Sequence, residues 1–355
     1  MNQQYMEKEQ FLDYLKEVEN VFLVCGKSFF QQKLYEKIVQ CNKKISAYSE
    51  IQPNPQIYCV EKGVKKFLET GATVIVAAGG GSAIDVAKGI KAYVDKDFNE
   101  EYMEKEITEN EIELITIPTT AGSGSEATHF SVVYRGHKKL SITHKSLLPQ
   151  KVVLLPELLD TLPIYQRKCT MLDAICHGIE SYWSINATEE SRIYSQEAIR
   201  GVVGAYQGYL ANKKSGNRKM LEAANKAGQA INLTFTTGAH AMSYGLTTKF
   251  KIAHGHAVAL CLQPIWSYMV ENSNDAKLNR RMEEIARFIG VSSRRQMNDF
   301  FNNIMKEVDF TPITGTNKDV EELVKVVDKN RMLNHPLKIE ENICRDIYKK
   351  ILMKE

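Results

Sequence analysis

Short runs of apolar and β-branched residues alternate with amphipathic stretches up to about residue 160. The run Val74–Ala78 is apolar at every position, which is typical of a strand covered on both faces, because a half-exposed strand alternates apolar with polar residues. This β-α-β-α rhythm predicts a parallel sheet. The elements expected here are strands at Val21–Cys25, Lys44–Tyr48, Thr73–Ala78, Leu114–Ile117, Phe130–Tyr134 and Val152–Leu155, and helices at Gln31–Cys41, Cys59–Thr70 and Ala83–Val94.

The pattern changes after Pro163. From Ile164 onward, apolar residues recur at helical spacing and β-type runs almost disappear. We therefore expect two domains, an α/β domain over residues 1–162 and an all-helical domain over residues 163–355. The helices expected in the second domain are Cys169–Ser184, Glu189–Leu210, Arg218–Asn232, Val258–Glu271, Ala276–Ile289 and Val320–Asn330.

The composition excludes several classes of protein. The 355 residues are 43% hydrophobic and 25% charged, as in an ordinary globular protein. The 46 Lys and Arg nearly balance the 43 Asp and Glu, so the basic field of a nucleic-acid binder is absent. The seven cysteines are scattered without a C-x-x-C pair, which favours a reducing cytoplasm over a disulfide framework. Neither a signal peptide nor a membrane-spanning run is visible.

A glycine-rich loop, Gly79-Gly80-Gly81-Ser82, stands between an expected strand and an expected helix. Glycines let the backbone approach a phosphate closely, and a helix N-terminus offers free N–H groups, so a pyrophosphate can bind at such a loop. The full G-x-G-x-x-G fingerprint is not met, because Ile84 stands in place of the third glycine. A tight turn that needs glycine for a positive φ is the alternative.

A second loop of small and hydroxyl residues, 118–128, follows the expected strand Leu114–Ile117. Parallel sheets bind ligands beyond the carboxyl ends of their strands, where both loops begin. This loop therefore favours a contact with a ribose or a phosphate, with a solvated connection as the alternative.

Four of the eight histidines, His177, His240, His254 and His256, fall within 80 residues of the helical half. Asp173 precedes His177 by four residues, so a helix places both side chains on one face. With His240 and His254, this pair could supply four N and O ligands to Fe(II), Zn(II), Mn(II) or Co(II). Separately hydrogen-bonded histidines are the alternative interpretation.

Four motifs together resemble the iron-containing, or group III, alcohol dehydrogenases: Gly79–Lys88, Pro118–Glu126, Asp173–Glu180 and Ala253–Leu260. The resemblance implies a Rossmann-like dinucleotide domain with a parallel sheet, followed by an all-helical metal domain, in the architecture of dehydroquinate synthase. It further implies NAD(P)-dependent interconversion of an alcohol and an aldehyde or ketone, and a homodimer. Dehydroquinate synthase and glycerol dehydrogenases share this architecture, but the second and third motifs favour the iron-type family.

Position by position, the resemblance implies two sets of ligand contacts. The metal ligands would be Asp173, His177, His240 and His254, holding one divalent metal, Fe(II) or Zn(II). The pyrophosphate loop would be Gly79, Gly80, Gly81 and Ser82. Further contacts to NADH or NADPH would come from Asn54, Asp85, Thr119, Thr120, Ser123, Thr128, Val132 and Lys139.

Two departures from the family pattern carry expectations of their own. Gly26, followed by Lys27, replaces an acidic residue that in many NAD-using members holds the ribose. Its loss removes a charge that repels a 2′-phosphate, so we expect NADPH to be accepted. Tyr244 stands where relatives often carry a histidine, and His256 is an extra one. Either could relay a proton as a catalytic residue, or serve only in packing.

The segments around His129, Tyr244 and His256 resemble the phosphonoacetaldehyde reductase branch. An anionic aldehyde would account for these three potential donors as substrate contacts. The product would be 2-hydroxyethylphosphonate. Sulfoacetaldehyde would need almost the same pocket, and a short neutral alcohol or diol is the conservative alternative. A non-catalytic nucleotide- or metal-binding protein is the alternative from another class.

Overall fold

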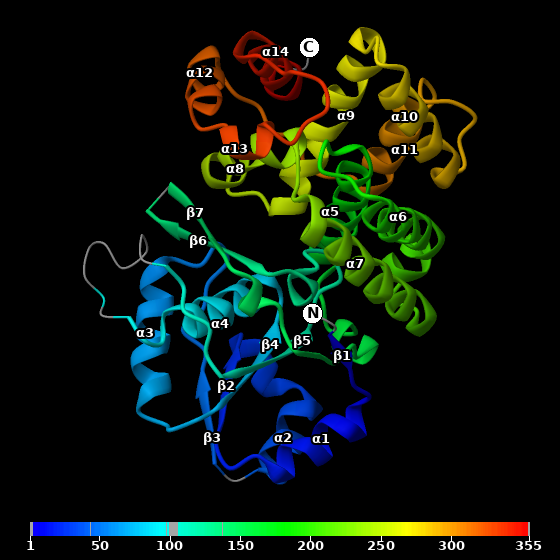
Figure 1. Ribbon diagram of the computed structural model, residues 1–355. Helices are drawn as coiled ribbons and strands as arrows, with labels where there is room; N and C mark the ends of the chain where they lie inside the picture. The colour runs from blue at the N-terminus through cyan, green and yellow to red at the C-terminus, as the bar shows by residue number, and fades with distance from the viewer. Residues whose placement is uncertain (1–2, 43, 97, 99–105, 137, 354–355) are drawn as a thin grey trace. The chain divides into compact units, whose positions relative to one another are not determined.

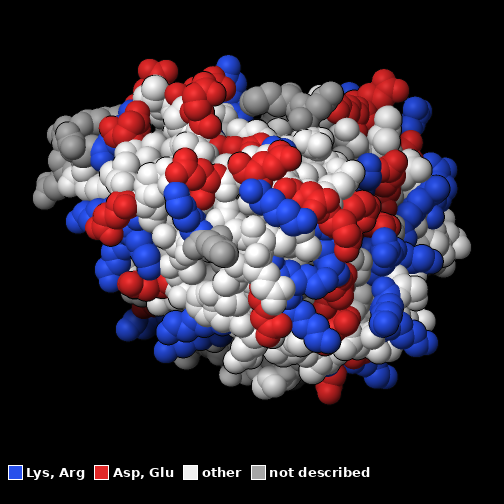
Figure 2. Space-filling model, turned by 90° about the horizontal axis from the view of Figure 1, so that it is seen from below, with Lys and Arg blue, Asp and Glu red and all other residues white. Residues whose placement is uncertain are grey.

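The computed structural model describes residues 3–42, 44–96, 98, 106–136 and 138–353. The chain divides into two compact units, Met1–Leu162 and Pro163–Glu355. Among the described residues, no helix is both long and apolar enough to cross a membrane. Basic and acidic side chains are interspersed over much of the face drawn in Figure 2, in keeping with the near balance of charge in the composition.

The first unit is built on a six-stranded parallel sheet in the order β1-β8-β5-β4-β2-β3. The parallel sheet predicted from the sequence is thus confirmed. Chain order reverses at β2, which has β3 on one side and β4 on the other, so the carboxyl ends of β2 and β4 form a topological switch point. The strands are β1 (Gln4–Tyr5), β2 (Val21–Cys25), β3 (Ile45–Tyr48), β4 (Val74–Gly79), β5 (Glu113–Pro118) and β8 (Lys151–Val152).

Helices cover both faces of this sheet, which is why β2 and β4 are apolar at consecutive positions (Figure 1). Phe22 and Val24 of β2 pack in a core with α3 (Ile57–Leu68) and α4 (Gly81–Tyr93). The alternate residues Val21, Leu23 and Cys25 pack with α1 (Lys8–Glu17) and α2 (Lys33–Cys41). A short 3-10 helix, η1 (Lys27–Gln31), connects β2 to α2.

One predicted strand in this unit lies outside the main sheet, and another is wrong in part. The residues expected at Phe130–Tyr134 form β6 (Phe130–Arg135), which pairs antiparallel with β7 (Lys138–Thr143) in a separate two-stranded sheet. The strand expected at Val152–Leu155 is wrong beyond Val152, because the chain turns into the 3-10 helix η5 (Pro156–Leu159). Two further 3-10 helices, η3 (Ser125–Ala127) and η4 (Lys145–Leu147), lie in the connecting loops. The sequence pattern did not indicate β1, β7 or α1.

The second unit is helical, as predicted, with no strand among its described residues (Figure 1). The sequence did not indicate α8, α11 or α14, and the expected helix Val320–Asn330 is two shorter helices. The helices are α5 (Ile164–Trp183), α6 (Glu189–Leu210), α7 (Lys214–Thr234), α8 (Gly238–Phe250), α9 (His254–Asn272), α10 (Ala276–Ile289), α11 (Met297–Val308), α12 (Asn317–Lys325), α13 (Lys329–Met332) and α14 (Glu341–Leu352).

The backbones of α6 and α7 approach each other closely where two glycines meet. A Cβ atom at Gly216 would lie 2.2 Å from the carbonyl carbon of Gly208 and 2.4 Å from the amide nitrogen of Tyr209. Both atoms belong to the backbone and cannot rotate away. Gly216 is therefore required by the packing of these helices rather than by its φ angle.

We expect Gly216→Ala to lower the free energy of unfolding by about 1–3 kcal/mol, because the added methyl group forces α6 and α7 apart. Gly204→Ala is the matched control: Gly204 lies in the partner helix α6, and a Cβ there would meet no described atom within 4 Å. This control should raise stability by about 0.5–1 kcal/mol, the usual gain of alanine over glycine within a helix. Urea-unfolding midpoints measure both, and equal midpoints for the two variants would contradict the prediction.

Candidate metal centre and cofactor loops

Helix α5 carries the first two residues of the centre. Asp173 and His177 lie one turn apart on this helix, and both are buried. His177 Nε2 lies 3.8 Å from Asp173 Oδ1. The four-residue spacing thus places the two side chains together, as the sequence pattern predicts.

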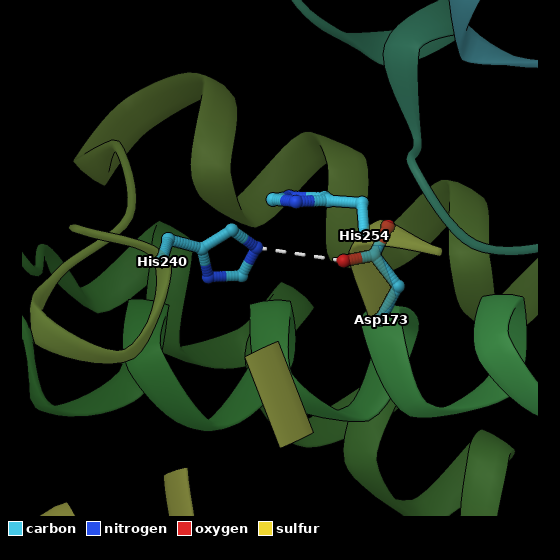
Figure 3. Close-up of side chains that lie close together, drawn as sticks. All are labelled: Asp173, His240 and His254. Carbon is cyan, nitrogen blue, oxygen red and sulfur yellow. Dashed lines mark ion pairs between the residues drawn. The ribbon is translucent and has the colours of Figure 1, made fainter. Parts of the chain in front are cut away.

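Helices α8 and α9 bring two more histidines to Asp173. His240 lies in the first turn of α8, and its Nε2 is 3.5 Å from Asp173 Oδ1. His254 is the first residue of α9. Ligand atoms of Asp173, His240 and His254 all lie within 4.8 Å of one another (Figure 3). His177 is not part of this three-residue group, although its ring stacks on that of His240 at 4.5 Å.

A glycine explains why α9 comes so close to α5. A Cβ atom at Gly255 would lie 2.0 Å from the carbonyl oxygen of Cys169 and 2.9 Å from the Cβ of Asp173. Only a residue without a side chain therefore permits this contact. Gly255 directly follows His254, so the contact that it allows also fixes where His254 sits relative to Asp173.

Two atoms of the centre are buried without a hydrogen-bond partner among the described residues: Asp173 Oδ1 and His240 Nε2. Both are acceptors in their ordinary states, and leaving such groups unpaired in the interior costs free energy. A carboxylate oxygen and imidazole nitrogens are suitable ligands for a borderline divalent metal such as Fe(II) or Zn(II). The donors present therefore fit the metal that the sequence motifs imply.

Glu180 supports His240 from the next turn of α5 and was not singled out from the sequence. Its Oε2 pairs with His240 Nδ1. Its Oε1 accepts hydrogen bonds from the Thr237 amide at 3.0 Å, the Thr237 hydroxyl at 2.7 Å and the Ala239 amide at 3.0 Å. A signal for this role exists in the sequence, because Asp173, His177 and Glu180 follow the i, i+4, i+7 spacing of one helix face.

The electrostatics of the centre favour a positive charge. Burial lowers the pKa of His240, but the carboxylates of Glu180 and Asp173 outweigh burial and raise this pKa to about 10. Burial likewise raises the pKa of Asp173, yet the three neighbouring imidazoles hold it below its usual range. Because both carboxylates are ionised, the space between Asp173 and His240 attracts a cation, which can be a proton or a metal.

The two predicted proton-relay residues lie in different places. The Tyr244 ring stacks on His254, with centroids 5.5 Å apart and planes 8° apart. His256 instead faces Tyr165, with 3.4 Å between the Tyr165 hydroxyl and His256 Nδ1, and its ring centroid lies 3.9 Å from that of Phe310. Two residues apart on a helix, His254 and His256 point to opposite sides. The geometry therefore favours Tyr244 over His256 as a neighbour of the metal ligands.

The predicted cofactor loops converge in the first unit. The Thr119 amide donates to the Gly79 carbonyl at 3.0 Å. A Cβ atom at Gly80 would lie 3.1 Å from Thr120, and one at Gly81 would lie 2.9 Å from the Ser123 hydroxyl. Gly81 begins α4, which Ser82 continues. The structure thus places both loops side by side at the carboxyl ends of β4 and β5.

The loop after β2 joins them at the topological switch point. A Cβ atom at Gly79 would lie 3.8 Å from the backbone nitrogen of Gly26. Gly26 has a φ of −70°, and among the described atoms its Cβ would meet only the Ser28 hydroxyl, at 3.9 Å. Lys27 is exposed beside it. The structure therefore leaves room for a side chain at position 26.

Asp85 and Thr128 have internal partners. The carboxylate of Asp85 accepts hydrogen bonds from the Ser125 hydroxyl at 2.7 Å and the Val132 amide at 3.2 Å. The Thr128 hydroxyl is 2.9 Å from the ammonium of Lys88, and only 1% of Thr128 is exposed. Burial lowers the pKa of Lys88 to about 8. This placement gives Thr128 a role in holding the second loop, and its cofactor contact stays a prediction.

The remaining predicted residues of this unit lie in loops and in the hairpin. Asn54 has a positive φ of 54° in the loop before α3. Val132 and Lys139 lie on β6 and β7. His129 precedes β6, with its ring 5.8 Å from that of Phe130.

Family models match both units. The model described as iron-containing alcohol dehydrogenase matches residues 4–156, and the C-terminal model of the Fe-containing alcohol dehydrogenase family matches residues 168–351. The chain belongs to the iron-containing alcohol dehydrogenase family. The resemblance inferred from the four sequence motifs is confirmed.

Individual curated relatives share about a quarter to a third of their aligned residues with this chain. Phosphonoacetaldehyde reductase from Streptomyces viridochromogenes is 33% identical over 210 residues, which are 56% of this chain and 53% of the relative. Aldehyde-alcohol dehydrogenase 2 from Entamoeba histolytica is 27% identical over 316 residues, 79% of this chain and 36% of the relative. The chain thus spans roughly one third to one half of the length of these two curated relatives.

Solved structures share the fold over the whole chain. The iron-containing alcohol dehydrogenase from Thermococcus thioreducens has a TM-score of 0.91 at 22% identity, covering 99% of each chain. Sulfoacetaldehyde reductase from Bifidobacterium kashiwanohense, solved in complex with NAD+, has a TM-score of 0.91 at 24% identity, covering 100% of this chain and 98% of its own. At these identities the likeness shows the fold alone.

We expect Glu180→Gln to weaken divalent-metal binding by about 10- to 100-fold, the usual cost of removing an outer carboxylate. A glutamine amide would donate to His240 Nδ1, so the proton of the imidazole would move to Nε2, which could then no longer coordinate. Titration of the metal-free variant with Zn(II) in a competition assay measures the loss. Glu271→Gln, at an exposed position of α9, is the matched control, and the same affinity in both variants would contradict the role of Glu180.

Proposed function

We propose that this chain is a metal-dependent, NAD(P)H-linked reductase that interconverts a short aldehyde and its primary alcohol. The observation that carries the proposal is the pair of buried, unpartnered atoms, Asp173 Oδ1 and His240 Nε2, which lie 3.5 Å apart beside His254. In this proposal His177 completes the ligand set. A metal at these residues supplies Lewis-acid polarisation of a carbonyl oxygen when it is bound.

The residues around the ligands have defined tasks in this mechanism. Glu180 would accept a hydrogen bond from the N–H at His240 Nδ1, so that Nε2, which faces Asp173, would be the nitrogen that holds the metal. Tyr244, stacked on His254, is the residue proposed to donate a proton to the oxygen of the reduced substrate. His256 serves instead in packing against Phe310 and Tyr165, and burial lowers its pKa to about 4, so that it is neutral at pH 7.

The first unit is proposed to hold the dinucleotide. Gly79, Gly80 and Gly81 let a pyrophosphate approach the N-terminus of α4, where backbone N–H groups are free of helical partners. The adjacent loop offers hydroxyl groups to the cofactor. The residues proposed to bind it are Gly26, Lys27, Asn54, Gly79, Gly80, Gly81, Ser82, Thr119, Thr120, Ser123, Val132 and Lys139, with Asp85 positioning the second loop through Ser125.

The substrate proposed is phosphonoacetaldehyde, reduced to 2-hydroxyethylphosphonate. The support is the 33% identity to the Streptomyces reductase over 210 residues, together with the polar residue Tyr244 beside His254. Sulfoacetaldehyde is the second candidate, because the structure of a sulfoacetaldehyde reductase shares the fold over the full chain. Both aldehydes carry a tetrahedral anion, so the same donors would recognise either.

We expect the metal-loaded protein to oxidise NADPH or NADH with phosphonoacetaldehyde at a higher kcat/KM than with propionaldehyde or lactaldehyde. Removal of the metal with a chelator should abolish turnover, and Zn(II) or Fe(II) should restore it. Steady-state assays across these aldehydes and sulfoacetaldehyde make the measurement. A preference for a neutral aldehyde would discard the anionic substrate, and no turnover with any aldehyde would favour a non-catalytic binding protein.

We expect NADPH to be accepted, because no carboxylate at position 26 repels its 2′-phosphate. Gly26→Asp should lower kcat/KM for NADPH by about tenfold or more, since it restores that repulsion, while its value for NADH should change little. The backbone at Gly26 accommodates a side chain, so Gly26→Asn is an uncharged control of the same size. A wild-type protein that uses NADH at least about tenfold better than NADPH would overturn the expectation.

A further inference from the structure

A cavity of about 520 Å³ lies entirely within the helical unit. It is bordered by α9, α11, α14 and the segment that follows α11. This volume falls within the range of about 300–1,000 Å³ that is usual for small-molecule sites. His256 lines the cavity, and His256 points away from the side of α9 that bears the metal ligand His254. The cavity is therefore separate from the group formed by Asp173, His240 and His254.

The charge of the lining has one sign. Lys306 of α11 and Lys350 of α14 both line the cavity, and no Asp or Glu is among its described lining residues. Neither lysine forms an ion pair within the described part of the chain, in contrast to Lys249, which pairs with Asp319 at 2.8 Å. Two ammonium groups from separate helices, without a carboxylate between them, favour an anion.

Apart from the two lysines, the lining combines seven apolar residues with five polar ones, His256, Gln263, Ser267, Asn302 and Thr311. Leu260 and Pro264 contribute from α9, Phe310 from the segment after α11, and Ile351 from α14. Pro264 lies within α9 and has no N–H, so the carbonyl of Leu260 receives no helical hydrogen bond from that position. An apolar wall with a few polar groups is the usual character of a small-molecule site.

We propose that this cavity binds a small amphiphilic anion, which consists of one carboxylate or phosphate head and an apolar body. The head group lies between Lys306 and Lys350, and the body contacts Leu260, Phe310 and Ile351. The proposal concerns a site apart from the metal ligands and holds whether or not the chain reduces aldehydes. Carboxylate and phosphate heads share this chemistry, so the experiment compares them directly.

Isothermal titration calorimetry on the metal-loaded protein, saturated with dinucleotide, tests the site with four probes. Octanoate and octyl phosphate carry a head and a body, 1-octanol has the body alone, and acetate has the head alone. Both amphiphilic anions should bind, and octanol and acetate should bind at least about tenfold more weakly. The tighter of the two anions identifies the preferred head group. Octanol that binds as tightly as octanoate would overturn the anionic character of the ligand.

Variants locate the binding. Lys306→Gln combined with Lys350→Gln should weaken octanoate binding by about tenfold. Each exposed lysine alone contributes little to the attraction of the carboxylate, but the double variant removes both contributions. Lys219→Gln, at an exposed lysine of α7, should leave it unchanged. Thr311→Trp fills the cavity from a loop position and should abolish binding while circular dichroism stays native. Unchanged binding in the double lysine variant or in the tryptophan variant would refute the site.

Discussion

The attraction between two buried carboxylates and the imidazole between them organises the helical unit. Asp173 and Glu180 lie two turns apart on α5, and His240 of α8 contacts both. Two anions in the interior are costly unless cations or hydrogen-bond donors neutralise them. The α8 N-terminus supplies donors to Glu180 through Thr237 and Ala239, and the imidazoles supply partners to Asp173. Among the described residues of this centre, Asp173 Oδ1 and His240 Nε2 are left without a hydrogen bond, and these are atoms that would hold a metal.

This constraint explains why the surrounding helices pack so tightly. The centre needs α9 close enough for His254 to approach Asp173, and Gly255 permits this because a side chain there would collide with the backbone of α5. Helix α8 has small residues around its buried face, including Ala239 and Ala241. The rigidity that holds the ligands thus comes from close backbone contacts as well as from hydrogen bonds.

In the α/β unit, close backbone contacts likewise position the candidate cofactor loops. The loops after β2, β4 and β5 all begin at the carboxyl ends of these strands, and glycines let the loops approach one another within contact distance. Lys88 of α4 is buried, and its ammonium holds the second loop through Ser125 and Thr128. A cofactor loop placed by a buried cation and by adjacent glycines is fixed before any ligand arrives, which is what precise phosphate recognition needs.

Local pattern determined much of this protein. The apolar run Val74–Ala78 predicts a buried parallel strand, and the spacing of Asp173 and His177 places them on one helix face, because both features depend only on the period of the local structure. The glycine loop after β4 was likewise visible, since strand, loop and helix are consecutive in the chain.

Only the tertiary structure decided the rest. Helix α8 has no amphipathic period, because it is buried on most sides, and β1 is too short to carry a pattern. The sequence could not separate Tyr244 from His256, since the direction of α9 against α5 determines which residue lies beside the ligands. The role of Glu180 depends on its contact with His240, and only the packing of α8 against α5 creates this contact. Contacts between residues distant in sequence depend on how helices pack, and a local pattern does not contain that information.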